Sequence, residues 1–374
     1  MDWFLILTSL IKIIGILLLT IMPIVAYASL AERRVSAIIQ DRLGPNRVGF
    51  GGVLQPIADG VKFMLKEDVT PGHVNKVYFW LAPVLVFLPA MLTAAVLPFG
   101  TNLDLSSIGL EGTMPLVISN IDAGPLFVFA IASLSVYGIV LAGWASNSKY
   151  PFLGGVRSTS QMISYEISLG LSIVPVLMIF GHLNLGEIVR EQAHNGWTLL
   201  PLWGDSAPWN HAEPWSLASL KSWILLIPLG ITFIIFMTSI FAETNRLPFD
   251  LPECETELVA GYHTEYSSMK FAMFMMGEYA AMVIGSGLAV TLFFGGWSLP
   301  GGWFSDEKVG LGGALSQFST FFGKIVAFIL FFIWVRWSIP RFRYDQLMKL
   351  GWVWFFEIAL FNILLTAGLL IWLG

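Results

Sequence analysis

Six carboxylic acids lie within 23 residues of this sequence, from Glu243 to Glu265, and Arg246 is the one lysine or arginine among them. Pro248 and Pro252 prevent a continuous helix, so part of the stretch is predicted to be an irregular loop. Where such a cluster adjoins an apolar phase, the carboxylates cannot all stay ionised, and they can exchange protons near neutral pH. A solvated acidic loop is the alternative. The acids are Glu243, Asp250, Glu253, Glu255, Glu257 and Glu265.

Three further acids, Glu166, Glu278 and Glu357, fall inside long apolar segments. An ionisable side chain within a membrane span is costly, and it marks a functional site by default, commonly a proton relay. Glu278 lies roughly 10 Å along a helix that starts near residue 271. Three arginines at the end of another apolar segment could supply counter-charge, or they could only set the topology. They are Arg336, Arg341 and Arg343.

The polar segment 32–76 contains a predicted surface helix. Asp59, Lys62 and Lys66 share one helical face, and Pro56 suits the first helical position. Apolar residues occupy the opposite face, which is typical of a short amphipathic helix at a membrane surface. An interfacial anchor without chemistry remains the alternative. The apolar residues are Ile57, Val61, Met64 and Leu65.

The elements that position these groups must be membrane helices. The 374 residues are 56% hydrophobic and only 12% charged, with a mean hydropathy of +0.74. A water-facing surface needs about twice that charged fraction. The single cysteine, Cys254, excludes a disulfide scaffold and any cysteine-ligated zinc or iron–sulfur site made by this chain alone. The mild net charge of −5 excludes a typical basic nucleic-acid binder.

An all-α polytopic membrane protein is therefore predicted, with one domain over residues 1–374. At about 20 apolar residues per crossing, eight spans are expected. They lie near 3–30, 77–98, 124–146, 160–181, 222–242, 271–295, 321–339 and 351–373.

Lysine and arginine are unevenly shared between the two sides of this arrangement. The connections after spans one, three, five and seven hold 15 of them, against 4 on the other side. The positive-inside rule makes the basic connections cytoplasmic and places both termini on the periplasmic or outer side. The predicted location is the bacterial inner membrane.

Several polar motifs of this chain resemble the H-type membrane subunit of respiratory complex I, the proton-translocating NADH:quinone oxidoreductase. They cover nearly the whole chain, in the order of that family. They are ERR at 32–34, RLGPNRV at 42–48, LQPIAD at 54–59, KED at 66–68, SYE at 164–166, AETNRLPFD at 242–250, LPE at 251–253, ELVAG at 257–261, HTEY at 263–266, GEY at 277–279 and PRFRYDQLM at 340–348.

The resemblance implies roles for particular residues. It implies a quinone chamber bordered by Glu32, Arg33, Arg42, Asp59, Arg246, Asp250, Glu253, Arg336 and Arg341. It also implies a proton path from that chamber through Glu166, Glu243, Glu255, Glu257, Glu265 and Glu278. The surface helix near 55–66 would lie at the lipid entrance of the chamber.

The resemblance also implies partners. The chain would carry no redox cofactor and no metal, and quinone would be its substrate. NADH, FMN and iron–sulfur clusters would belong to hydrophilic partner subunits, and antiporter-like membrane subunits would complete the complex. No catalysis is expected of the isolated chain.

Two other interpretations stay open: the related membrane subunit of an energy-converting hydrogenase, and a stand-alone proton-coupled transporter. The complete first basic connection and the YDQLM ending favour complex I over both. The chain also departs from the family pattern at Glu357. That acid could be an additional proton site, or it could pair with a neighbouring subunit.

Overall fold

The computed structural model describes residues 3–108, 112–200, 217–253, 255–301 and 308–373, with only the backbone described at 3–7, 107–108, 217–222, 255–256 and 373. Within these residues, eight helices are long and apolar enough to cross a membrane. The prediction of an all-helical polytopic membrane protein with about eight spans is confirmed. The helices are α1–η1–α2 (Trp3–Lys12, Ile13–Ile21, Met22–Ile39), α4 (Lys76–Thr93), α5–α6 (Gly124–Ala132, Leu134–Ala145), α7 (Lys149–Phe180), α9 (Leu217–Glu243), α11 (Ser268–Phe293), α12 (Leu311–Ser338) and α13–η6–α14 (Tyr344–Lys349, Leu350–Phe355, Phe356–Leu373).

Several helices extend beyond the spans that hydropathy predicts. α7 begins at Lys149 instead of near residue 160, and α12 begins at Leu311 instead of near residue 321. The apolar window marks only the segment that needs lipid, whereas a helix continues until a cap, glycine or proline ends it. The extension of α7 carries Arg157, which pairs with Glu257 at 2.7 Å.

Short elements occupy the connections. The predicted surface helix is present as α3 (Gln55–Leu65), with Pro56 in its first turn. The sequence pattern did not predict a small sheet of order β2-β1-β3, in which β1 pairs antiparallel with β2 and parallel with β3. Residues 201–216 of the long outer loop and Cys254 lie outside the described residues. The remaining elements are η2 (Phe50–Gly52), η3 (Ala94–Val96), β1 (Asn102–Asp104), η4 (Leu105–Ile108), β2 (Thr113–Pro115), α8 (Leu185–Asn195), α10 (Glu255–Leu258), η5 (Gly261–His263) and β3 (Lys308–Val309).

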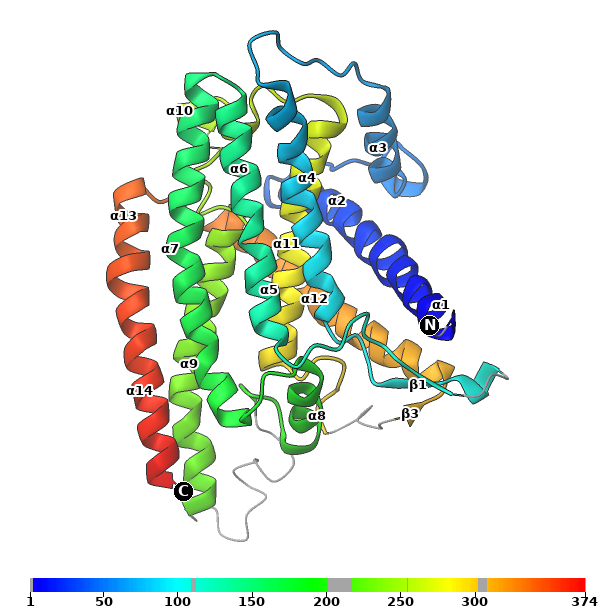
Figure 1. The fold of residues 1–374 in the computed structure, drawn as a ribbon, viewed down its shortest axis with the longest axis vertical. Coiled ribbons are helices and arrows are strands. Elements are labelled where there is room, and N and C mark those ends of the chain that lie inside the picture. Colours follow the sequence, from blue (N-terminus) through cyan, green and yellow to red (C-terminus); the bar gives the residue numbers. More distant parts are fainter. Residues whose placement is uncertain (1–2, 109–111, 201–216, 254, 302–307, 374) are drawn as a thin grey trace.

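Helix α11 lies at the centre of the bundle. It packs against α2, α4, α9 and α12, and most of its second half is buried. Figure 1 shows α7, α9 and α14 running side by side, whereas the α1–α2 helix and α12 run obliquely to them. In the same view, α3 stands beside α2, away from α7, α9 and α14. Because α2, α3 and α12 diverge around α11, the bundle can open on that side.

Glycines allow the close approach of α4, α6 and α7. A side-chain carbon added at Gly143 of α6 would lie 2.7 Å from the carbonyl oxygen of Pro151 in α7. At Gly138 of the same helix it would lie 2.9 Å from the carbonyl oxygen of Ala82 in α4. Small residues at such crossings are the usual means of tight helix packing in lipid, where apolar burial gives no net driving force.

A lysine of α12 caps the C-terminal end of α11 by donating hydrogen bonds to the carbonyl oxygens that follow it. The Nζ atom of Lys324 in α12 donates to the carbonyl oxygens of Phe294, Gly296 and Ser298 at 2.7, 2.8 and 2.5 Å. It also lies 4.2 Å from the centre of the Trp197 ring. These carbonyls follow a helix C-terminus, where a cation is favoured. The contact fixes α12 to α11 at the end opposite α3.

The α6–α7 crossing gives a direct test of the packing. Gly143→Ala is expected to reduce the free energy of unfolding by about 1–3 kcal/mol, because the backbone of α7 must move away. The matched control is Gly170→Ala in α7, where an added carbon meets nothing within 4 Å. Thermal aggregation of the purified protein in detergent measures both. Equal melting temperatures for the two variants would refute the close-approach argument.

Candidate functional site

A cavity of about 530 Å³ lies between α2, α3, α11 and the end of α12. We call it the chamber. Most of its wall is apolar, and methionines are prominent there, which suits an adaptable surface for a flexible apolar ligand. Polar side chains gather toward one part of the wall, from Glu32 and Ser36 of α2 and Arg336 of α12. The methionines are Met22, Met64, Met269, Met275 and Met276.

Glu32 is the centre of a buried ion cluster beside the chamber. Its side chain is buried, yet it accepts hydrogen bonds from Arg246, Arg336 and Tyr279. The Arg246 Nη1 to Glu32 Oε2 distance is 3.3 Å, and the Arg246 guanidinium lies 4.1 Å from the centre of the Tyr279 ring. Two guanidinium groups therefore share one carboxylate, and the guanidinium of Arg336 lines the chamber. Positive charge next to an apolar cavity favours a ligand that presents oxygen atoms with partial or full negative charge.

Arg246 is cationic and has donor atoms without a hydrogen-bond partner among the described residues. Burial opposes its charge, but Tyr279, Glu278 and Glu253 raise the pKa of Arg246, so it stays cationic. Its Nε and Nη2 atoms are buried and have no hydrogen-bond partner among the described residues. A buried unpaired donor is costly, so water or a ligand oxygen is the expected partner.

Two sets of contacts hold α3 over the chamber. Arg33 of α2 pairs with Asp59 of α3 at 2.8 Å, and both residues line the cavity. At the other end of α3, the Ser268 hydroxyl donates to the carbonyl oxygens of Phe63 and Lys66 at 2.9 and 3.1 Å. The first pair is partly exposed, 53% for the Arg33 side chain and 21% for Asp59, and such a pair contributes little to stability. Its effect is to set the position of α3 relative to α2.

The acidic loop is fixed by interior contacts. Gln161 of α7 donates through Nε2 to the carbonyl oxygens of Ala242 and Phe249, at 2.8 and 2.7 Å. Arg341 pairs with Asp250 at 2.6 Å and ties this loop to the connection after α12. The prediction of an irregular loop is confirmed, and of the two alternatives left open, the solvated loop does not fit its first part, where Phe249 and Asp250 are buried.

Further along the loop, the ring Nε2 of His263 lies 3.3 Å from Glu253 Oε1. Burial lowers the pKa of His263 to about 4, so the ring is neutral at neutral pH. Burial also raises the pKa of Tyr262 well above its ordinary value, so its hydroxyl remains a donor and contacts Glu278 Oε1 at 2.8 Å. These neighbours join the loop to α11.

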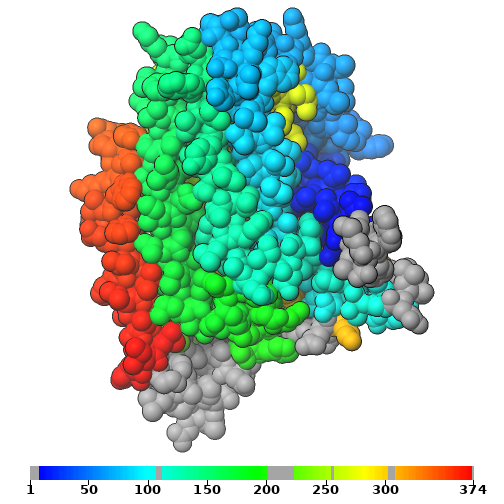
Figure 2. Space-filling view, viewed as in Figure 1, coloured from blue at the N-terminus to red at the C-terminus, as the bar shows by residue number. Residues whose placement is uncertain are grey.

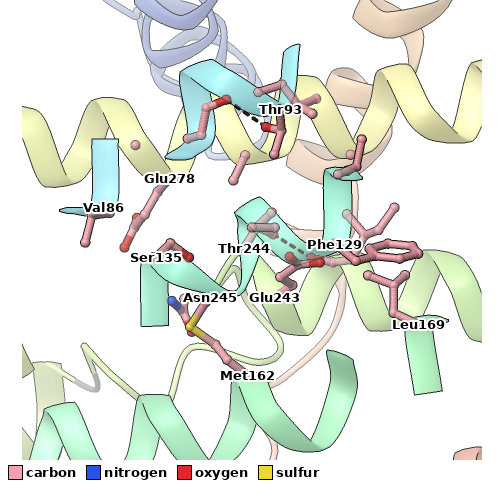
Figure 3. Close-up of a pocket in the computed structure, with 18 of the residues that line it drawn as sticks. Val86, Thr93, Phe129, Ser135, Met162, Leu169, Glu243, Thr244, Asn245 and Glu278 are labelled. Carbon is pink, nitrogen blue, oxygen red and sulfur yellow. Dashed lines mark hydrogen bonds between the residues drawn. The ribbon is translucent and has the colours of Figure 1, made fainter. Parts of the chain in front are cut away.

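A second, smaller cavity of about 70 Å³ lies between α4, α6, α9 and α11. Glu243 and Glu278 both line it, and Figure 3 shows the two carboxyls on different helices, with Ser135 and Thr244 beside them. The volume suffices for about two water molecules at liquid density, and the few polar groups in the mostly apolar wall, Glu243, Glu278 and Ser135, can hold them. Glu278 and Tyr279 are adjacent on α11, so one helix presents a side chain to each of the two cavities.

The structure does not gather all the residues that the motifs single out. Arg42 is exposed on the connection after α2, where its Nε donates to Gln40 at 2.7 Å, and it does not line the chamber. Glu257 is largely exposed and pairs with Arg157, outside both cavities. Glu265 is half-buried and lines neither cavity. Glu166 of α7 is half-buried and interacts electrostatically with Glu243. The side chain of Glu255 lies outside the described residues.

Sequence reasoning missed the aromatic and methionine members of the site. Tyr279 stands in a recognised motif, but no role was assigned to it. Met269, Ala272, Met276 and Tyr279 are spaced by three, four and three residues, which places them on one face of α11 toward the chamber. That spacing was a usable signal. Gln161 gave none, because its partners Ala242 and Phe249 are more than 80 residues away in the sequence.

Fold and site together define an integral membrane protein. It has a chamber lined in part by charged side chains, and a smaller cavity nearby lined by two carboxylic acids. A model of the NADH dehydrogenase family matches residues 11–367 of this chain. Full-length relatives agree with that match. A 48% identical protein of Ehrlichia ruminantium, aligned over 96% of this chain and 88% of its own length, is named as the H-type subunit of an NADH-quinone oxidoreductase.

Two further relatives, also named as H-type subunits of NADH-quinone oxidoreductase, are similar to this chain over nearly their whole length. The protein of Cytophaga hutchinsonii is 44% identical, over 92% of each chain. The protein of Flavobacterium psychrophilum is 43% identical, over 98% of each chain. The chain belongs to the NADH dehydrogenase family. The resemblance drawn from the polar motifs is confirmed.

His263 predicts a defined pH dependence of stability. Its folded pKa of about 4 lies below its ordinary value of 6.5. Between those values the unfolded chain binds a proton that the folded chain does not. The free energy of unfolding should therefore fall as the pH drops from 6.5 to 4, by roughly 3 kcal/mol at most, with no contribution above 6.5.

Melting temperatures of the purified protein at pH 4–8 measure this dependence. The variant His263→Asn should lose part of the acid-side slope. His194→Asn, at an exposed histidine of α8, is the matched control and should keep it. If wild type and His263→Asn decline in parallel, the assignment to His263 is wrong.

Proposed function

We propose that this chain is the membrane subunit of an NADH-quinone oxidoreductase that forms the quinone-binding chamber and links quinone reduction to proton translocation. The observation that carries the proposal is the Glu32–Arg246–Arg336–Tyr279 cluster beside a large apolar cavity, in a chain of the NADH dehydrogenase family. The reaction is inferred from the names of the relatives, and the cavity is the place where we expect the substrate to bind.

A quinone has a polar head with two carbonyl oxygens and an apolar tail. The methionine-rich wall between α2, α3 and α11 suits the tail, and the arginines beside Glu32 suit the head. Reduction adds negative charge to the head oxygens, and fixed guanidinium groups stabilise that charge more than they stabilise the neutral quinone. Arg336 lines the chamber itself and is the foremost candidate for this contact.

The coupling to protons would run along α11. Arg246 contacts Glu32 and Tyr279, and it also interacts electrostatically with Glu278. A negative charge that draws Arg246 toward the chamber would weaken its support of the Glu278 carboxylate and favour proton uptake there. Glu243, in the same small cavity, is the next acceptor. Glu253, Asp250 and Glu166 border this route.

Electrons would come from a hydrophilic partner subunit that carries iron–sulfur clusters, with NADH and FMN further away in the complex. Antiporter-like membrane subunits would receive the coupling signal. The basic connections, with α3 and the acidic loop, would face the cytoplasm of a bacterial cell, and both termini would face the periplasm. The hydrophilic partner would therefore dock on the side of α3.

Narrowing the chamber should weaken quinone use without unfolding the chain. Gly60 lines the chamber from α3, and a side-chain carbon added there meets nothing within 4 Å. Gly60→Leu in the assembled complex should raise the KM for quinone about tenfold, a change of about 1.4 kcal/mol. Gly72→Leu, equally open but not among the chamber-lining residues, is the control. Quinone titrations of NADH oxidation measure both, and an unchanged KM for Gly60→Leu would place the substrate elsewhere.

Removing the Glu278 carboxylate tests the proton route. Glu278→Gln keeps the size of the side chain and its contact with Tyr262, so the complex should assemble. Coupled quinone reduction and proton pumping should fall by at least tenfold, because an amide takes up no proton at neutral pH. Activity and pumping in membrane vesicles measure the effect. Wild-type rates in both assays would remove Glu278 from the route. The proposed function as a whole would be overturned if the chain purified alone and transported a solute.

A further inference from the structure

The outer face of η6 and α14 carries a stripe of four large exposed side chains. Trp354, Glu357, Phe361 and Leu364 follow one another at intervals of three, four and three residues, so they share one helical face. The exposed fractions of the three apolar members are 54%, 65% and 66%, and Glu357 is also exposed. We call these four residues the outer stripe.

Nothing in the described part of the chain covers the outer stripe. α14 packs against α7 and α9 through its other face, where Asn362 donates to the Pro228 carbonyl oxygen at 2.9 Å. Figures 1 and 2 show α14, in red, at the edge of the molecule with no segment outside it. Most of such a face on a membrane helix could contact lipid.

Glu357 does not suit lipid. It lies roughly 9 Å along the helix from the predicted start of the span at residue 351 and about 24 Å from Leu373, so it stands inside the apolar span. No hydrogen bond or ion pair joins its carboxyl to any described residue, and it lines neither cavity. Ionisable groups at such depth nearly always face protein or water and pair with another group. The structure thereby separates Glu357 from the interior carboxylates and leaves it in need of an external partner.

Trp354 supports the same conclusion independently. The neighbouring Trp352 turns its indole inward and donates to the Ser164 hydroxyl at 2.8 Å. Trp354 points outward, and its indole nitrogen has no acceptor among the described residues. Tryptophan is enriched among the residues that dominate the binding energy of protein interfaces, and Trp354 lies one helical turn from Glu357 on the same face.

We propose that the outer stripe is the contact surface for a transmembrane helix of another subunit, which places a lysine, arginine or histidine opposite Glu357. This inference rests on the proposed function, since it requires a multisubunit complex. Charge complementarity selects the partner, because a cation both neutralises the carboxylate and satisfies its oxygens. A second copy of this chain fits poorly, since a two-fold contact of like stripes would bring two Glu357 carboxylates together. Lipid alone leaves the carboxyl unpaired.

Site-specific photo-cross-linking in the intact complex tests the proposal. A photoreactive residue replaces Phe361, native membranes are illuminated, and cross-linked peptides are identified by mass spectrometry. The expected product joins this chain to a transmembrane segment of one other subunit of the complex, with a basic residue within one helical turn of the linked position. Adducts with lipid only, with a second copy, or with a segment that has no basic residue would each overturn it.

A charge exchange tests the pairing itself. Glu357→Gln should weaken retention of the cross-linked subunit roughly threefold to tenfold in a detergent titration. Glu357→Arg should weaken it more, and a basic-to-glutamate change in the partner should restore retention. Leu364→Met, on the same stripe without a charge change, is the matched control. Unchanged retention in Glu357→Gln, or no rescue, would refute the ion pair.

The two proposals fail in different ways. If this chain is in the purified NADH-quinone oxidoreductase but Phe361 yields no subunit adduct, only the inference about the outer stripe is wrong. If the chain is absent from that complex, both are wrong. Quinone reduction is measured in every variant, and the variants of the outer stripe should retain it wherever the complex stays assembled, because Glu357 is remote from the chamber-lining residues.

Discussion

The ion cluster around Glu32 is the interaction on which the arrangement of this protein depends. It joins α2, the loop after α9, α11 and the end of α12 through one buried carboxylate. A buried charge is tolerated only when its partners are held in place. The surrounding contacts supply that constraint: Gln161 and Arg341 fix the loop, and Lys324 fixes α12 to α11 at the far end. The chamber exists because these helices meet at the cluster and diverge beyond it.

Helix α11 connects the chemistry of the two cavities. Its successive residues Glu278 and Tyr279 point in different directions, about 100° apart around the helix, one toward the small carboxylate cavity and the other toward Glu32. Arg246 lies over the ring of Tyr279 and interacts electrostatically with Glu278. In the proposed function, this contact is the route by which a charge change in the chamber would reach a protonatable group. The same central position explains why α11 tolerates little exposure and why Lys324 caps its end.

Acidic residues in this chain serve three different environments. Glu32 and Asp250 are compensated by arginines, Glu243 and Glu278 face a small, mostly apolar cavity, and Glu357 faces outward. Glu257 is also compensated by an arginine, Arg157, but this pair lies at the exposed end of α7 and outside both cavities. The role of a carboxylate inside a low-dielectric helix bundle therefore cannot be assigned from its residue type alone. Its partners decide whether it is structural, proton-accepting or part of an interface.

The sequence by itself determined the class of fold, the number of membrane helices, the surface helix α3 and the family. Those properties depend on local apolar length, on helix periodicity and on polar strings that lipid contact alone would not produce. Met269, Met276 and Tyr279 also carried a readable spacing. By contrast, the pairing of Glu32 with Arg246 and Arg336 joins residues more than 200 positions apart. The exposure of Arg42, Glu257 and Glu357 was equally invisible in the chain. Only the tertiary structure decided these points. The residue type fixes the charge of a side chain, whereas the packing of the helices determines which groups it contacts.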